Sequence, residues 1–193
     1  MAKRTTSNTE KLSDIENIEA QEVTKEVETQ KTIEKKKPMI PSEIDPNQII
    51  VVKNGFQGKL VYKSPRTSEK YRWELFGDEQ EIELKELRNA KSSAKKFFIN
   101  NWFMFDEEYS WVIDYLGLGQ YYKNVLKLEE FDDLFSKPAS EIEKIVSKLS
   151  DGQKQSVAYR ARQLISENGI DSNKAIAALE KSLGTTLILR ENN

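Results

Sequence analysis

The chain has 193 residues, with 30 Lys and Arg against 32 Asp and Glu, so its formal net charge is -2. This near-neutral balance argues against a general polyanion binder, which needs a basic excess or a basic face. The sequence contains no cysteine and no histidine, which excludes disulfides, thiolate chemistry and every mechanism that uses a histidine base.

Residues 1–45 are expected to form an extended N-terminal arm. They contain no aromatic residue, and charges of both signs are mixed among Thr and Gln. Such a segment buries too little apolar surface to offset the entropy lost on ordering, so it is either solvated or ordered by a partner. The candidate partner-binding residues of the arm are Ile15, Ile18, Val23 and Val27. No apolar signal core follows Met1 and no stretch reaches about 20 apolar residues, so no membrane partner is expected.

Residues 46–107 are expected to form a small β-sheet with a long helix. β-branched and aromatic residues at 48–52, 58–63 and 70–76, with a shorter run at 81–84, predict an antiparallel β-meander. Asn54-Gly55 is a strong hairpin-turn signal. A sheet of this size is not stable alone and has to pack on a helix. Apolar residues three or four positions apart predict that helix over Lys85–Phe105.

Residues 108–193 are expected to form a helical subdomain. Ser140 with Glu143 and Ser150 with Gln153 have the spacing of capping boxes at helix N-termini. Asp171 or Ser172 is expected to cap the last helix, which Gly184 should end. The predicted fold class is therefore α+β, with a small antiparallel β-meander packed on a long helix, a helical subdomain and an extended N-terminal arm.

The sequence predicts no catalytic residue, cofactor or metal site. The runs Asp106-Glu107-Glu108 and Asp132-Asp133 are interpreted as acids in the first turns of helices, where the helix dipole favours negative charge. Gly117 and Gly119 lack the pattern of a phosphate-binding loop and are interpreted as a break between helices.

Aromatic residues are dense between positions 97 and 122. Those at 97–105 cover more than one face of the predicted helix, so this helix is either buried on several sides or partly exposed to a partner. The candidate partner-binding residues here are Phe103, Tyr109, Trp111, Tyr121 and Tyr122.

The C-terminal helix pair offers an alternative function in nucleic-acid binding. Helices over 152–166 and 172–183, with a turn at Asn168-Gly169, have about the lengths of a helix-turn-helix. Its candidate nucleic-acid contacts are Lys154, Arg160, Arg162 and Lys174. The second helix offers few base-reading groups, so an ordinary helical hairpin remains the other interpretation.

The stretch from Asn54 to Glu107, NGFQGKLVYKSPRTSEKYRWELFGDEQEIELKELRNAKSSAKKFFINNWFMFDE, resembles uncharacterised virion or assembly proteins of tailed bacteriophages and prophages of Gram-positive bacteria. The segments WVIDYLGLGQYYKNVL and LSDGQKQSVAYRARQLI continue the resemblance. It implies a non-enzymatic structural or assembly component of a virion that is made in the host cytoplasm. Its partners would be other phage structural proteins or further copies of itself. A phage-encoded DNA-binding or regulatory protein is the alternative.

Overall fold

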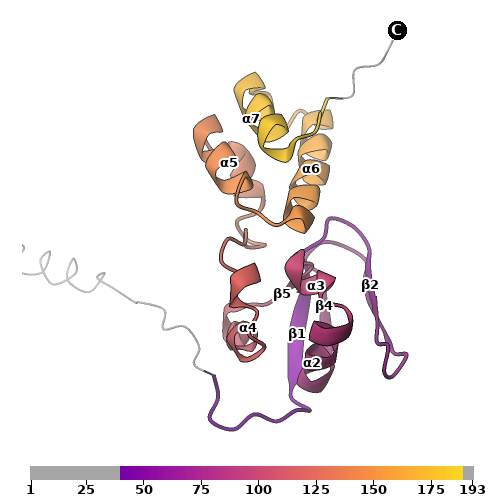
Figure 1. Cartoon of the computed structure of the whole chain (residues 1–193). Coiled ribbons are helices and arrows are strands. Elements are labelled where there is room, and N and C mark those ends of the chain that lie inside the picture. Colours follow the sequence, from indigo (N-terminus) through magenta and orange to yellow (C-terminus); the bar gives the residue numbers. More distant parts are fainter. Residues whose placement is uncertain (1–39, 189–193) are drawn as a thin grey trace, which may run out of the picture. The chain divides into compact units, whose positions relative to one another are not determined.

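The computed structural model of the chain describes residues 40–188. The candidate arm residues Ile15, Ile18, Val23 and Val27 lie outside the described residues. Along the described chain, short antiparallel strands come first and a group of helices follows (Figure 1). This arrangement confirms the predicted α+β fold class.

The strands form two small antiparallel sheets within residues 40–188. They are β1 (Ile49–Asn54), β2 (Leu60–Lys63), β3 (Lys70–Trp73), β4 (Glu79–Glu83) and β5 (Phe103–Met104). β1 lies in the middle of the first sheet, in the order β4-β1-β5, and β2 pairs with β3 in the second. Ile50 lies opposite Ile82 in the first sheet, and Tyr62 lies opposite Tyr71 in the second.

This strand order differs from the predicted meander, because β1 does not pair with β2 across the Asn54-Gly55 turn. The buried side chain of Asn54 explains the difference. Its Nδ2 donates to the carbonyl oxygens of Gly58 and Leu75, both at 2.8 Å, and its Oδ1 accepts from the Phe56 amide at 2.9 Å. Asn54 thus holds a wide loop in place, and β1 pairs with β4 and β5 instead.

The long helix predicted over Lys85–Phe105 is divided into three elements: α2 (Leu84–Ser93), α3 (Lys96–Ile99) and β5. Ser93 Oγ donates back to the Asn89 carbonyl at 2.9 Å, as serine does near helix ends. Asn101, at φ 53°, then turns the chain out of α3. A continuous helix would point its aromatic residues in several directions, whereas the break lets Phe97, Phe98 and Phe103 pack in one core.

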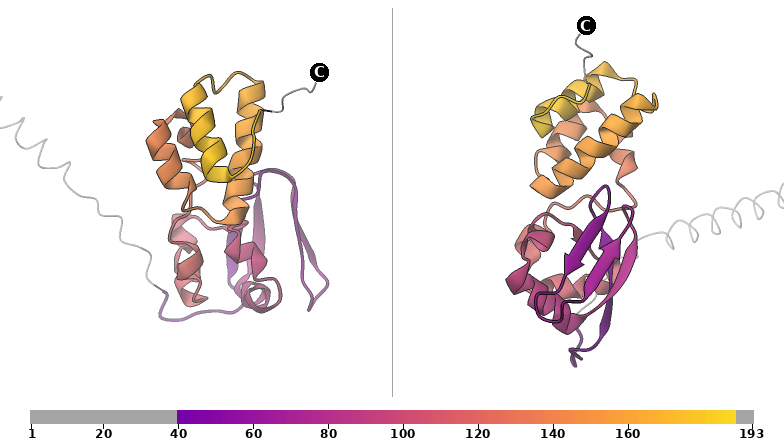
Figure 2. Two further views of the ribbon diagram at one scale, coloured as in Figure 1. Left: turned by 45° about the horizontal axis from the view of Figure 1, so that its top comes forward. Right: turned by 90° about the vertical axis from the view of Figure 1, so that its right-hand side faces the viewer.

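The remaining helices follow β5. They are α4 (Trp111–Tyr115), α5 (Ala139–Val146), α6 (Asp151–Ser166) and α7 (Asn173–Leu183), with short 3-10 turns at Glu107–Tyr109, Gly119–Tyr121 and Asp132–Ser136. The helices α5, α6 and α7 form one group, which is orange and yellow in both views of Figure 2.

Two of the predicted helix N-caps and the predicted C-terminal glycine are confirmed, and one predicted N-cap is wrong. Ser150 accepts from the Gln153 amide at the start of α6, and Ser172 accepts from the Ala175 amide at the start of α7. Gly184 ends α7 in the left-handed conformation. Ser140 does not cap α5, because Pro138 takes the N-cap position and Ser140 lies inside the helix. Proline is suited to a helix start, so it moves the boundary by two residues.

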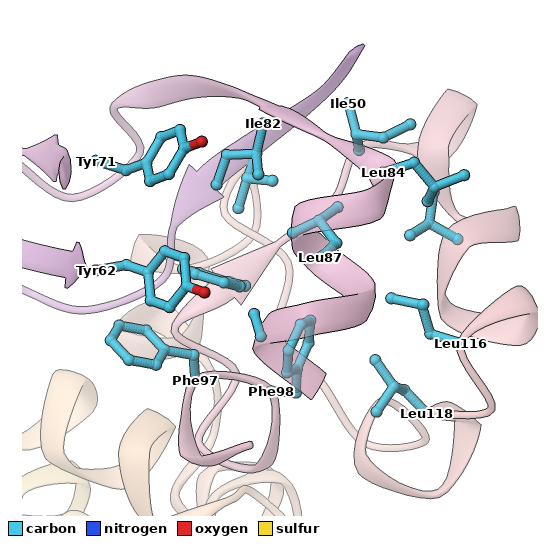
Figure 3. Close-up of a cluster of buried hydrophobic side chains, with 14 of the residues drawn as sticks. Ile50, Tyr62, Tyr71, Ile82, Leu84, Leu87, Phe97, Phe98, Leu116 and Leu118 are labelled. Atoms are coloured by element: carbon cyan, nitrogen blue, oxygen red, sulfur yellow. The ribbon is translucent and has the colours of Figure 1, made fainter. Parts of the chain in front are cut away.

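The described chain has two hydrophobic cores. We call the part around the first core, residues 44–122, the sheet lobe, and the part around the second core, residues 126–187, the helical lobe. Phe76 of the sheet lobe packs against the second core. Figure 3 shows the first core, where the rings of Tyr62 and Phe97 lie side by side with centroids 5.3 Å apart. The second core is mainly aliphatic and is built around the inward faces of α5, α6 and α7.

Small residues join the two lobes. The Ser156 hydroxyl on α6 donates to the Gly55 carbonyl at 3.1 Å and accepts from the Gln57 amide at 3.2 Å. A Cβ on Gly152 would lie 2.3 Å from the Asn100 carbonyl oxygen, so only glycine allows this approach. The start of α6 is therefore fitted directly against two loops of the sheet lobe.

Candidate functional site

The structure corrects part of the predicted aromatic partner-binding surface. Phe103 is 0% exposed and Trp111 is 4% exposed, so both belong to the core of the sheet lobe. Tyr109, Tyr121 and Tyr122 are half-buried. The Tyr122 hydroxyl donates to the Phe103 carbonyl at 2.6 Å, and burial raises the pKa of Tyr122. Of the five predicted residues, Tyr109 and Tyr121 retain side chains that a partner could contact.

Tyr121 belongs to a cluster of lysines and aromatic rings that we call the lysine–aromatic surface. Its members are Phe56, Lys91, Lys95, Lys96, Trp102 and Tyr121. The Lys95 ammonium lies 5.5 Å from the centre of the Tyr121 ring, and the Lys96 ammonium lies 5.9 Å from that of Trp102. Both distances are within the range of cation–π attraction.

The turn after α3 places Trp102 in this cluster. Asn101 Nδ2 donates to the Tyr121 carbonyl at 2.9 Å and ties the turn to the segment after α4. The Gly55 amide donates to the Trp102 carbonyl at 2.9 Å, and a Cβ on Gly55 would lie 2.2 Å from the Asn101 carbonyl oxygen. The absent side chain of Gly55 therefore lets two loops meet, and the rings of Phe56 and Trp102 contact edge to face, 5.9 Å apart.

The cations of this region are not neutralised within residues 40–188. Arg88, Lys91, Lys95 and Lys96 have exposed side chains, and no ion pair joins any of them to a carboxylate of the described chain. Lys53, by contrast, pairs with Asp106 at 2.9 Å and with Glu79 at 3.3 Å. The α2–α3 segment therefore presents positive charge that the rest of the described chain leaves unbalanced.

Two buried polar atoms in the same turn have no hydrogen-bond partner within the described chain. They are the Asn101 Oδ1 oxygen and the Trp102 Nε1 nitrogen. An unpaired buried polar atom costs about 1–3 kcal/mol, and such atoms are rare in folded proteins. Asn101 also has the left-handed backbone conformation, at φ 53°. The turn therefore holds Trp102 in a position that stability alone does not favour, as is common at functional sites.

The buried acid of the sheet lobe has a structural partner. Glu86, 5% exposed, accepts from the Tyr62 hydroxyl at 2.6 Å. Burial, helped by Glu86, raises the pKa of Tyr62 and keeps the phenol protonated. A protonated phenol bound to a buried carboxylate satisfies both groups, so this pair stabilises the core and offers no activated nucleophile.

The four predicted nucleic-acid contacts lie in different surroundings. Arg160 makes two hydrogen bonds to the Asp132 carboxylate, at 3.0 and 2.6 Å, and these raise the pKa of Arg160. Arg162 donates to the Thr186 carbonyl at 3.2 Å. Lys154 borders a hollow of about 550 Å³ with Lys144 and Lys181.

Lys174 borders a different hollow, of about 500 Å³. The two helices of the alternative function are joined by residues 167–172, and α7 packs mainly against α5 and less against α6. Six residues form a longer connection than the three- or four-residue turn of a helix-turn-helix.

Sequence reasoning missed five members of this surface as candidate site residues: Phe56, Lys91, Lys95, Lys96 and Trp102. One signal could have found the lysines: residues 87–105 contain Arg88, Lys91, Lys95 and Lys96 among aromatic residues and no acidic residue. The contribution of Phe56 had no local signal, because it depends on the approach of Gly55 to Asn101.

Within residues 40–188, no group of three or more Asp and Glu residues is arranged to hold a metal ion. None of the helices in this part of the chain is long and apolar enough to cross a bilayer. Comparisons with protein-family models, with curated proteins and with solved structures gave no match.

Proposed function

We propose that the protein is a non-enzymatic structural or assembly component of a tailed bacteriophage particle, which binds other particle proteins through the lysine–aromatic surface. The particle is suggested by the resemblance of residues 54–107 to virion and assembly proteins of such phages. The mode of action is suggested by the surface itself. Partners would be other structural proteins of the phage or further copies of this chain.

The observation that carries the binding function is the combination of unpaired cations and half-buried rings around one rigid turn. Protein interfaces favour Trp, Tyr and Phe because these side chains provide large contact areas at little entropic cost. The contacts of Asn101 and Gly55 fix Trp102 in place before a partner arrives. Such preorganisation lowers the cost of binding.

Mass spectrometry of purified particles from a host carrying the gene tests the particle assignment. We expect the protein in the particles at a fixed ratio to the major capsid protein. A ratio near one would favour a shell or tail tube, and a small ratio would favour a connector or baseplate. Its absence from particles, together with abundance in infected cells, would contradict a place in the mature virion.

A further inference from the structure

We infer that the lysine–aromatic surface binds an acidic polypeptide segment of a partner protein, an inference that rests on the proposed binding function and specifies the chemistry of the partner. The surface carries Lys91, Lys95 and Lys96, and Arg88 lies one helical turn before Lys91. No carboxylate of the described chain pairs with these cations.

Each of the three lysines lies close to another part of the sheet lobe. Lys91 Nζ lies 3.8 Å from the position of a Cβ built on Gly117, just before the turn that carries Tyr121. Lys95 follows over the Tyr121 ring, and Lys96 lies over the rings of Phe97 and Trp102. A partner segment that carries several carboxylates would supply the anions that these ammonium groups lack within the described chain.

The rings of this surface favour a peptide over a nucleic acid. Base stacking requires exposed ring faces, but Phe56, Trp102 and Tyr121 are half-buried, and lysine ammonium groups lie over Trp102 and Tyr121. The lysines leave their charged ends available for carboxylates while their stems cover the rings.

The partner segment should carry apolar residues among its acids. Ile99, at the end of α3, is 40% exposed, and Trp102 and Tyr121 each retain some exposed ring area. Apolar contacts at these residues would exclude water around the charge pairs, which strengthens each pair. A segment in which Ile or Val residues are interspersed among glutamates has this chemistry.

The test measures binding of a synthetic 16-residue peptide of repeated Glu-Glu-Ile-Ala to the full-length protein. Trp102 is the half-buried tryptophan, while Trp73 and Trp111 are buried, so its fluorescence should change on binding. The same peptide with Gln in place of Glu should bind at least about tenfold more weakly, because pairing with several lysines is lost. Added salt should weaken the binding of the Glu peptide.

Two triple variants distinguish the effect of the surface lysines on peptide binding from the effect of net charge. Lys91→Gln, Lys95→Gln and Lys96→Gln together should weaken peptide binding about tenfold or more. The matched control, Lys63→Gln, Lys70→Gln and Lys148→Gln together, removes the same charge from exposed lysines elsewhere and should bind as the wild type does. Circular dichroism checks that both variants are folded.

Equal binding of the Glu and Gln peptides, or equal weakening by both triple variants, would overturn the inference. Tighter binding of a single-stranded oligonucleotide than of the Glu peptide, lost in the first triple variant alone, would assign the surface to nucleic acid instead. The two proposals also fail separately: absence from particles contradicts the phage assignment, whereas absence of peptide binding contradicts the chemistry of the partner.

Discussion

The sheet lobe and the helical lobe reach stability in different ways. In the sheet lobe, aromatic residues from distant parts of the chain meet: the Trp73 ring lies 5.5 Å from Phe103, and its Nε1 donates to the Val52 carbonyl at 2.9 Å. In the helical lobe, Ser150 and Ser172 cap helices whose aliphatic faces pack on one another. The first lobe depends on contacts between distant residues, and the second depends more on local signals.

The two lobes differ in how well they can support a binding surface. A lobe fixed by long-range contacts can hold a turn such as Asn101-Trp102 that carries unpaired polar atoms, because the surrounding core determines its position. The candidate surface accordingly lies on the sheet lobe. The helical lobe contacts the sheet lobe through Ser156 and Gly152. Its exposed aromatic ring, Tyr159, is isolated.

The largest expected effect is at Trp73, which is 0% exposed. Trp73→Ala should lower the free energy of unfolding by about 3–5 kcal/mol, because it removes a large buried ring and leaves the Val52 carbonyl without its donor. Urea denaturation followed by circular dichroism measures the change. Tyr159→Ala, at a ring that is 58% exposed, is the control and should be close to neutral. Similar losses for both variants would contradict the described core.

The junction between the lobes should be the next most sensitive place. Gly152→Ala should lower the free energy of unfolding by about 1–3 kcal/mol, because its Cβ would overlap Asn100. The control is Gly119→Ala, whose Cβ would meet the nearest atom, Asp114 Oδ1, at an ordinary 3.8 Å. Thermal unfolding measures the stability of both variants. A stabilised Gly152→Ala protein would mean that the lobes do not meet as described.

A pH series tests the buried hydroxyls of the sheet lobe. Burial raises the pKa of Tyr62 and of Tyr71, so these phenols keep their protons when unfolded tyrosine loses them above about pH 10. Their contribution to stability is complete below pH 10 and falls at higher pH by about 1.4 kcal/mol per pH unit for each tyrosine, until the raised pKa is reached.

Tyr62→Phe should make the alkaline loss of stability less steep, and it should cost about 1–3 kcal/mol at neutral pH because Glu86 loses its donor. Urea denaturation at pH 7 and at pH 10–11 measures both effects. An unchanged pH dependence would show that the Tyr62 hydroxyl titrates alike in the folded and unfolded chain. Tyr109→Phe is the comparison at a half-buried ring beside Glu108, where burial also raises the pKa of the phenol.

The smallest effects distinguish the caps of the helical lobe. Ser172→Ala should lower the free energy of unfolding by about 1 kcal/mol, because Ser172 caps α7. Ser140→Ala should be near neutral or slightly stabilising, because Ser140 lies inside α5 and alanine is the better helix former. Equal losses in the free energy of unfolding for the two variants would indicate that Ser140 caps α5, as the sequence predicted.

The sequence predicted the helical lobe better than the sheet lobe for a physical reason. Caps and helical periodicity are local, so the helices around Val157 and Leu179 could be located from their own residues. β1 pairs with strands that are distant in the sequence, as Ile50 does with Ile82, and Asn54 supports this arrangement by its bond to Leu75, 21 positions away. No local pattern contains that information.

The candidate site was only partly predictable for the same reason. Aromatic density between positions 97 and 122 indicated the right region, and Tyr121 does belong to the surface. Phe103 and Trp111 could not be distinguished from surface residues, because their burial depends on the break at Asn101. A residue in the left-handed conformation after a four-residue helix is not foreseeable from periodicity alone.

The most direct test is carbodiimide cross-linking of intact particles, followed by mass spectrometry. The reagent joins lysine amines to carboxylates that are already in contact. We expect links from Lys91, Lys95 or Lys96 to Asp or Glu residues of another particle protein or of another copy, and few links from Lys63, Lys70 and Lys148. Particles that contain the protein but show links only from the second set of lysines would contradict the binding role of the lysine–aromatic surface.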